Sequence, residues 1–475
     1  MVSNKIFTYV FLRYFFLAIQ MATSLIIAGK VGTYFLGIWG FINLLTMFVS
    51  KLDIGLIAST NVAFSKRDNK CDQKSDYYNA SLTIFVICIV IFLLGMCLIS
   101  ADIHILKKYE VNELYVVIMM NASLFIFQSF YIVMLRLIGF VKDSVIIQGL
   151  VIVAVFMAII FSQESQMLVN AVLSQSIGLI LGLVLAMIRL YRYFGRPEKL
   201  RLVFPDNSLP QFLYGISVFY FPLMHRFLLS ENMSVKLFGL FSLAYTLSNI
   251  INVFLGSIST LVFPKSINKL KGQSVSKSAD IVFGLNKRYL LLFSVLFLLS
   301  VIPVRILISW LGEPFNEFIL YYFVLILMAL MRYVGSGFVA FLMITKSRIV
   351  LLAKYSVLLL VISAIFVEIA RSFALQFTVV SVSFIVFGAI FSFILIHTSK
   401  LMLESRSYLN FYKGILLSYF LPVSLLMVLT YLGYFYVGYI ISSIVFVLVN
   451  VDYLRLILID CMRIIRNQNI LDVNL

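Results

Sequence analysis

The chain has 475 residues, of which 62% are apolar and 12% are charged, and its mean hydropathy is +1.06. Soluble domains average about 45–50% apolar residues, so this composition excludes an ordinary soluble domain. The net charge of +17 would indicate nucleic acid in a soluble protein. Here the basic residues collect in short gaps between apolar runs, so we exclude nucleic acid and predict a polytopic membrane protein.

Apolar segments long enough to cross a membrane fill most of the chain. A spanning helix needs about 20 mostly apolar residues. Because backbone groups in lipid must be hydrogen-bonded locally, each such segment is predicted to be a helix. The fourteen candidates, in chain order, are 9–29, 36–63, 80–100, 113–139, 144–162, 168–190, 211–230, 237–262, 289–311, 318–344, 349–369, 373–397, 414–434 and 436–457.

The basic residues alternate between the gaps and so predict an orientation. Of the 37 Lys and Arg, 25 lie in the gaps after even-numbered segments, in the two tails, or at Arg189 and Arg455 in the last turn of a segment. Five lie in the gaps after odd-numbered segments, and seven lie within the segments. The positive-inside rule then places both termini in the cytoplasm. The longest gap, 263–288, is too short for a soluble domain, so the function is expected to come from the helices.

Two short sequence motifs recur near the ends of the second and eighth segments. Residues 35–41 match 237–243 in their order of small and large side chains, and 59–62 match 259–262. The offsets of 202 and 200 favour duplication of a six-helix unit, although a non-repeating bundle stays an alternative. Halves of six helices share one orientation, as in transporters that rock two bundles around a central site.

The predicted organisation is therefore all-α, with about fourteen transmembrane helices in two six-helix lobes plus two C-terminal helices. The first lobe covers 1–205 and the second covers 206–400. Residues 401–475 hold the last two helices and a cytoplasmic tail.

Three short motifs in the sequence resemble those of a known family. Tyr34–Trp39 (YFLGIW), Leu52–Leu56 (LDIGL) and Pro303–Gly312 (PVRILISWLG) are similar to bacterial polysaccharide, or O-antigen, flippases of the Wzx type. These belong to the multidrug/oligosaccharidyl-lipid/polysaccharide exporter superfamily. The resemblance implies an inner-membrane protein whose lobes face a central cavity. It also implies movement of an undecaprenyl-diphosphate-linked oligosaccharide between leaflets, with a polysaccharide polymerase and chain-length machinery as partners.

Charged residues inside the predicted helices are the candidate site, because each costs about 2.5–3.5 kcal/mol at a helix centre. The basic ones are Arg13, Lys51, Arg136, Arg226, Arg305, Arg332 and Lys354. Lys51 and Arg332 lie deepest, and Arg226 and Arg305 lie in the outward third, so these four are predicted to bind substrate. Cations favour an anion, and guanidinium groups pair with phosphate oxygens bidentately, which suits a lipid diphosphate. The other three lie near cytoplasmic ends, where long side chains reach the headgroups.

Two further features accompany these cations. Gly335–Gly337 follows Arg332 and weakens its helix, either to line a cavity or to allow close helix packing. Asp53 is the only carboxylate deep in a segment, and we predict that it couples transport to H⁺ or Na⁺. A static salt bridge between helices is the alternative. Lys51 is a poor partner for Asp53, because residues two apart on a helix do not face each other.

Other functions stay open to different degrees. A multidrug or metabolite exporter of the same superfamily is the main alternative. Those that export cations depend on buried carboxylates, often in the first helix, and residues 9–29 contain none. A peptidoglycan lipid flippase also has a cationic cavity. A membrane polymerase would need a sizeable outward loop and catalytic groups, so no enzyme activity, metal or cofactor is expected.

Overall fold

The computed structural model describes residues 2–53, 55–65, 70–97, 104–196, 200–203, 208–270, 273–312, 318–335, 338, 341–342, 346–372, 377–399 and 414–465. Every regular element among them is helical. Seven of these helices are long and apolar enough to cross a membrane, and five shorter ones are also apolar. The predicted all-α membrane architecture is confirmed, and each of the fourteen predicted segments overlaps helical backbone.

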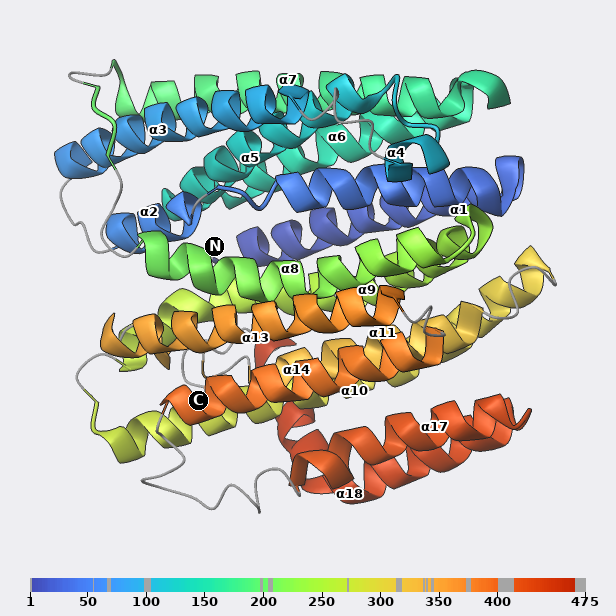
Figure 1. The fold of residues 1–475 in the computed structure, drawn as a ribbon. Coiled ribbons are helices and arrows are strands. Elements are labelled where there is room, and N and C mark those ends of the chain that lie inside the picture. The colour runs from blue at the N-terminus through green and yellow to red at the C-terminus, as the bar shows by residue number, and fades with distance from the viewer. Residues whose placement is uncertain are drawn as a thin grey trace. The chain divides into compact units, whose positions relative to one another are not determined.

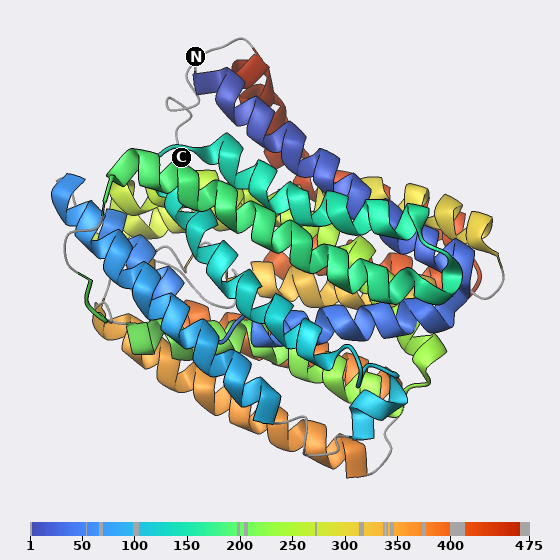
Figure 2. The same ribbon diagram turned by 90° about the horizontal axis from the view of Figure 1, so that it is seen from above.

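The described chain forms two compact units. Unit 1 comprises Met1–Leu243 and Ser356–Leu375, and unit 2 comprises Ala244–Tyr355 and Gln376–Leu475. The predicted lobe boundaries at 205 and 400 stay a prediction. The long helices within unit 1, drawn in blue to green in Figures 1 and 2, run side by side.

Unit 1 contains the helices up to the start of α9 and the second part of α13. In chain order they are α1 (Val2–Val49), α2 (Leu56–Ser65), α3 (Lys70–Cys97), α4 (His104–Lys108), α5 (Tyr115–Leu137), α6 (Val141–Phe161), the 3₁₀ turn η2 (Glu164–Gln166), α7 (Met167–Phe194), α8 (Ser208–Asn232), the first residues of α9 (Val235–Leu270) and the second part of α13 (Lys346–Ser372). Helix α6 packs against α1 and α7, and α5 packs against α3 and α7.

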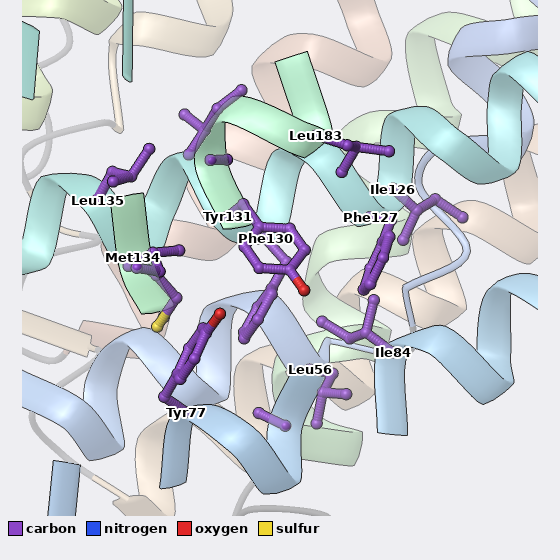
Figure 3. Packing of buried hydrophobic residues seen from close by; sticks show 14 of the residues in the cluster. Leu56, Tyr77, Ile84, Ile126, Phe127, Phe130, Tyr131, Met134, Leu135 and Leu183 are labelled. Carbon is purple, nitrogen blue, oxygen red and sulfur yellow. The ribbon is translucent and has the colours of Figure 1, made fainter. Parts of the chain in front are cut away.

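The core of unit 1 is a cluster of buried aromatic and aliphatic side chains from α2, α3, α5 and α7, with one residue from α6 (Figure 3). The ring of Tyr77 stacks on Phe194, with centroids 4.9 Å apart. By contrast, Leu94 is 61% and Phe161 is 76% exposed. Large apolar side chains on the outside are expected where lipid, not water, is the solvent.

Close approach of α6 and α7 depends on two glycines of a Gly-x-x-x-Gly pattern. A Cβ at Gly178 would overlap the backbone of Val151 on α6. A Cβ at Gly182 would crowd Ile147 of α6 and overlap the Gln128 side chain of α5. Such small residues let helices in lipid approach closely and gain packing energy.

Unit 2 contains the remaining helices. They are the rest of α9, α10 (Val275–Leu311), α11 (Phe318–Tyr333), the first part of α13 (Lys346–Ser372), α14 (Phe377–Ser399), the π-helical turn η4 (Leu416–Phe420), α17 (Leu421–Tyr431) and α18 (Phe435–Ile465). Helix α11 packs against α10 and α14, and α17 packs against α18. The buried amide of Asn286 donates to the Val334 carbonyl at 2.6 Å and so satisfies the end of α11.

The structure differs from the first two predicted segments in where the helices bend and end. Residues 9–29 and 36–63 are joined through Gly32, whose φ of 78° bends the long helix α1. The second segment is then interrupted between Val49 and Leu56. Gly55 has a φ of 68°, which favours glycine, and a Cβ there would overlap the backbone of Phe212 on α8. The prediction of one continuous helix over 36–63 is therefore wrong.

Candidate functional site

The second half of α1 and helix α8 form the packed pair that carries the candidate site in unit 1. Phe227 of α8 contacts Phe41 and Phe48 of α1 edge to face, with centroids 6.3 and 5.1 Å apart. Further along the chain from α1, Gly55 approaches the start of α8 at Phe212. These contacts run in opposite chain order, so the two helices are antiparallel. They bring residues from both predicted lobes into one unit.

Lys51 and Asp53 lie in the interruption between α1 and α2. Both are half-buried. One carboxylate oxygen of Asp53 accepts a hydrogen bond from the Ile57 N–H at 3.2 Å, and the Asp53 carbonyl accepts from the Leu56 N–H at 3.0 Å. The Asp53 side chain therefore caps the start of α2, where a carboxylate satisfies an otherwise unpaired N–H and is favoured by the helix dipole.

The interruption also changes the expected relation between the two charges. The argument that Lys51 and Asp53 cannot face each other assumed a helix through both residues. No helix runs there, and the charge of Lys51 acts favourably on the Asp53 carboxylate. The static alternative for Asp53 thus has a specific form, a helix cap beside a lysine, and its predicted role in ion coupling stays a prediction.

Arg226 is the most enclosed of the predicted cations that the structure describes. It lies in α8, and only 3% of the residue is exposed. The next residue, Phe227, is the one that contacts Phe41 and Phe48. A buried charge is costly unless its surroundings compensate for it, so this position is a strong candidate for a functional cation.

The two predicted cations of unit 2 are placed differently. The Arg305 guanidinium of α10 lies over the ring of Phe435, 5.4 Å from its centroid, at the start of α18. Arg332 is in the last turn of α11, and its side chain lies outside the described residues. Helix α11 ends one residue later, at Tyr333, next to the predicted weak point. Gly335 packs closely on Leu395 of α14, which supports the packing interpretation at that glycine.

A contact between α4 and the end of α8 was not expected from the sequence. The Lys108 ammonium donates to the carbonyls of Ser230, Glu231 and Met233 at 2.8, 2.7 and 2.7 Å. The Tyr109 hydroxyl donates to the Ser230 carbonyl at 2.8 Å. We refer to these five residues as the α4–α8 cluster. Lys108 satisfies the last carbonyls of α8 and complements the negative end of its dipole.

The α4–α8 cluster is partly buried. Burial lowers the pKa of Lys108 from its ordinary value, while the nearby Glu231 carboxylate opposes this shift. Burial raises the pKa of Tyr109, which keeps its hydroxyl a neutral donor. The Tyr109 ring stacks on Phe41 with centroids 4.1 Å apart. By the predicted topology, this cluster closes the outward end of the α1–α8 pair.

The two copies of the first repeated motif, residues 35–41 and 237–243, lie in contact next to this cluster. A Cβ at Gly37 would overlap the carbonyl oxygen of Val235, and a Cβ at Gly239 would overlap the carbonyl oxygen of Thr33. A Cβ at Gly40 would overlap the Ser242 side chain. The matched glycines thus let α1 and α9 cross at close range. For the second repeated motif, the side chains of the copy at 259–262 lie outside the described residues.

Among the described residues, no group of three or more His, Cys, Asp or Glu side chains is arranged to hold a metal ion. No family model matches the sequence. No curated protein matches it either.

Solved structures share the fold at low sequence identity. The lipid II flippase MurJ, in an inward closed conformation, aligns with a TM-score of 0.64 and 12% identity over 94% of this chain and 99% of its own. An outward-facing multidrug resistance MATE family transporter of the MOP superfamily aligns with a TM-score of 0.56 and 13% identity over 84% and 96%. The MATE multidrug transporter DinF-BH has a TM-score of 0.56 and 14% identity over 85% and 96%. The chain therefore has the fold of these membrane transporters.

Proposed function

We propose that the chain is a flippase of the bacterial inner membrane that moves an undecaprenyl-diphosphate-linked oligosaccharide, an O-antigen or capsule repeat unit, to the outer leaflet. The observation that carries the proposal is Arg226, a cation almost fully buried in α8. Lys51, in the interruption that follows the partner helix α1, is a second cation. The likeness in fold to a lipid II flippase over nearly the whole of both chains supports a lipid-linked cargo.

The chemistry of a diphosphate fits these residues. A guanidinium group binds phosphate oxygens through two parallel N–H donors, and an ammonium group binds them as a point charge. In the proposed mechanism Lys51 and Arg332 neutralise the diphosphate, and Arg226 and Arg305 assist nearer the outward side. The polyprenyl tail stays in lipid, so only the headgroup and sugars need a polar path.

Alternating access requires that the outward end open and close. The α4–α8 cluster and the Gly37–Val235 crossing are the contacts that hold this end shut in the proposed cycle. Arg226 lies one helical turn before Ser230, whose carbonyl accepts from both Lys108 and Tyr109. Separation of the cluster would therefore admit water next to the buried cation and favour release of the anionic headgroup.

The second candidate function is a multidrug or metabolite exporter, and Asp53 is the observation that favours it. The carboxylate lies in a helix interruption, and the likeness to two multidrug transporters supports this class. In the flippase proposal Asp53 instead couples the return step to H⁺ or Na⁺. A polysaccharide polymerase and chain-length machinery would act on the delivered unit, and the chain itself would have no catalytic role.

Reconstitution in liposomes tests the proposal directly. A fluorescent undecaprenyl-diphosphate-linked sugar is added, and its exposure to an impermeant quencher is followed with time. Wild-type protein should speed exchange between leaflets, and Arg226→Gln should reduce that rate at least tenfold. Lys354→Gln is the matched control, because Lys354 is exposed. Exchange that is unchanged by Arg226→Gln would remove Arg226 from the site, and exchange that is absent in wild type while a cationic dye is exported would exclude the flippase.

A further inference from the structure

Two arginines outside the proposed substrate site lie close together in unit 1. Arg13 is in the first half of α1, and Arg136 is in the last turn of α5. Arg136 contacts Ser144 in the first turn of α6, and the part of α1 beside Arg13 packs on the first half of the same helix. Helix α1 packs against both α5 and α6, and the Phe16 ring, one turn after Arg13, fills the space above Gly149 of α6. The fold therefore holds two like charges together.

The hydrogen-bond partners of this pair are neutral. Arg13 donates from Nη1 to the hydroxyl of the buried Tyr9 at 2.6 Å. Arg136 donates from Nε to the Ser144 hydroxyl oxygen at 3.4 Å, a long contact. Within the described part of the chain, neither guanidinium has a carboxylate at ion-pair distance. The acidic residue in the first turn of α6, Asp143, instead pairs with Arg189 at 2.8 Å.

An anion with several acceptor oxygens, bound between the two arginines, would stabilise this arrangement. Each guanidinium has five donors in a planar fork, and the neutral contacts use one donor of each. Phosphate oxygens match that fork and would replace repulsion between the two arginines with attraction to a shared anion. Both residues lie near the predicted cytoplasmic ends of their helices, at the depth of lipid headgroups. Basic pockets between helices on that side of a membrane bind anionic lipid headgroups.

We propose that Arg13 and Arg136 together bind the phosphate of an anionic lipid at the predicted cytoplasmic surface of unit 1. The phosphate has two possible sources with the same chemistry, a phospholipid of the surrounding leaflet or a polyprenyl diphosphate. The site is separate from Lys51, Arg226, Arg305 and Arg332, and it does not depend on the flippase proposal.

Thermal unfolding of the full-length protein in lipid nanodiscs tests this site. The discs contain phosphatidylcholine alone, phosphatidylcholine with phosphatidylglycerol, or phosphatidylcholine with undecaprenyl diphosphate. Wild type should unfold at a higher temperature when either anionic lipid is present. Arg13→Gln and Arg136→Gln should lose most of that rise, yet in phosphatidylcholine alone they should be at least as stable as wild type, because a repulsion has been removed. Lys142→Gln, an exposed change of the same charge at the start of α6, should keep the rise.

Native mass spectrometry gives a second, independent readout. Each arginine variant should bind the anionic lipid about tenfold more weakly, a loss of about 1.4 kcal/mol, whereas Lys142→Gln should bind it as wild type does. Arg136→Lys, which keeps the charge without the fork, should fall between the two.

The lipid that acts identifies the source. A response to phosphatidylglycerol supports a resident membrane lipid, and a response to undecaprenyl diphosphate alone supports a polyprenyl carrier at the same site. The proposal is overturned if neither lipid raises the unfolding temperature of wild type. It is equally overturned if Lys142→Gln loses as much of the rise as Arg136→Gln, or if both glutamine variants are unstable without anionic lipid.

Discussion

Removal of the Lys108 ammonium should open the predicted outward end of the α1–α8 pair. The three hydrogen bonds from Lys108 join α4 to the last carbonyls of α8 at 2.7–2.8 Å. A hydrogen bond to a charged group contributes about 1.5–3 kcal/mol, but these three share one charge at a half-buried position. We therefore expect Lys108→Met to destabilise the closed end by about 2–3 kcal/mol, or roughly 30- to 150-fold in the closed-to-open ratio.

A cysteine at Ser230 reports this opening. Ser230 is fully buried, and replacing its hydroxyl by a thiol leaves the carbonyl that accepts from Lys108 and Tyr109 in place. In a chain whose four native cysteines are replaced by serine, an impermeant maleimide added to whole spheroplasts would label Cys at this position slowly. Lys108→Met should raise the labelling rate by the factor above.

The neighbouring Lys107 provides the control, since Lys107→Met removes an exposed charge from the same helix. An unchanged rate in Lys108→Met would refute the reasoning, as would an equal rise in Lys107→Met. Labelling only after the membrane is permeabilised would instead contradict the predicted orientation.

Three further substitutions separate the proposed roles. Asp53→Ala should destabilise the protein by about 1 kcal/mol through loss of the α2 cap, measured by thermal unfolding. Asp53→Asn keeps an acceptor, so it should fold as wild type and lose only ion-coupled transport. Full coupling in this variant would restrict Asp53 to capping. Gly37→Ala should destabilise by about 1–3 kcal/mol because its methyl group overlaps backbone, whereas Gly29→Ala, with open space around its Cβ, should be neutral in the same unfolding assay. Arg332→Gln should insert normally and abolish transport in liposomes; retained transport would remove Arg332 from the site.

The positions of the helices were accessible from sequence because lipid allows few alternatives. A run of about 20 apolar residues can only be a helix there, so hydropathy alone located the spans. The interruption before α2 was missed although a local signal was present. Asp53-Ile54-Gly55 combines a good N-cap residue with a glycine, a pattern typical of a helix start after a turn.

The contacts of the basic residues could not be predicted, because their partners are distant in sequence. Lys108 and Lys30 are two of the five basic residues in the gaps after odd-numbered segments, where the positive-inside rule disfavours them. In the structure Lys108 satisfies the end of α8, and the Lys30 ammonium donates to the Ile160 carbonyl at the end of α6, at 3.2 Å. The partners are 122 and 130 residues away. Both lysines act as C-caps, for which cations are favoured.

The repeated motifs illustrate a different limit of prediction from sequence. Their similarity indicated duplication, but a pattern of small and large residues does not say what each copy touches. The structure shows Gly37 and Gly239 at one crossing, against Val235 and Thr33. Their spacing therefore also serves close packing, which a single sequence cannot distinguish from shared ancestry.

The most direct test of the account is the leaflet in which lipid-linked oligosaccharide accumulates when host cells are depleted of this protein. The flippase proposal predicts that complete repeat units build up on the cytoplasmic face and that surface polysaccharide disappears. Wild-type protein should restore export, and the Arg226→Gln variant should not. Repeat units that still reach the outer leaflet after depletion would contradict the proposal.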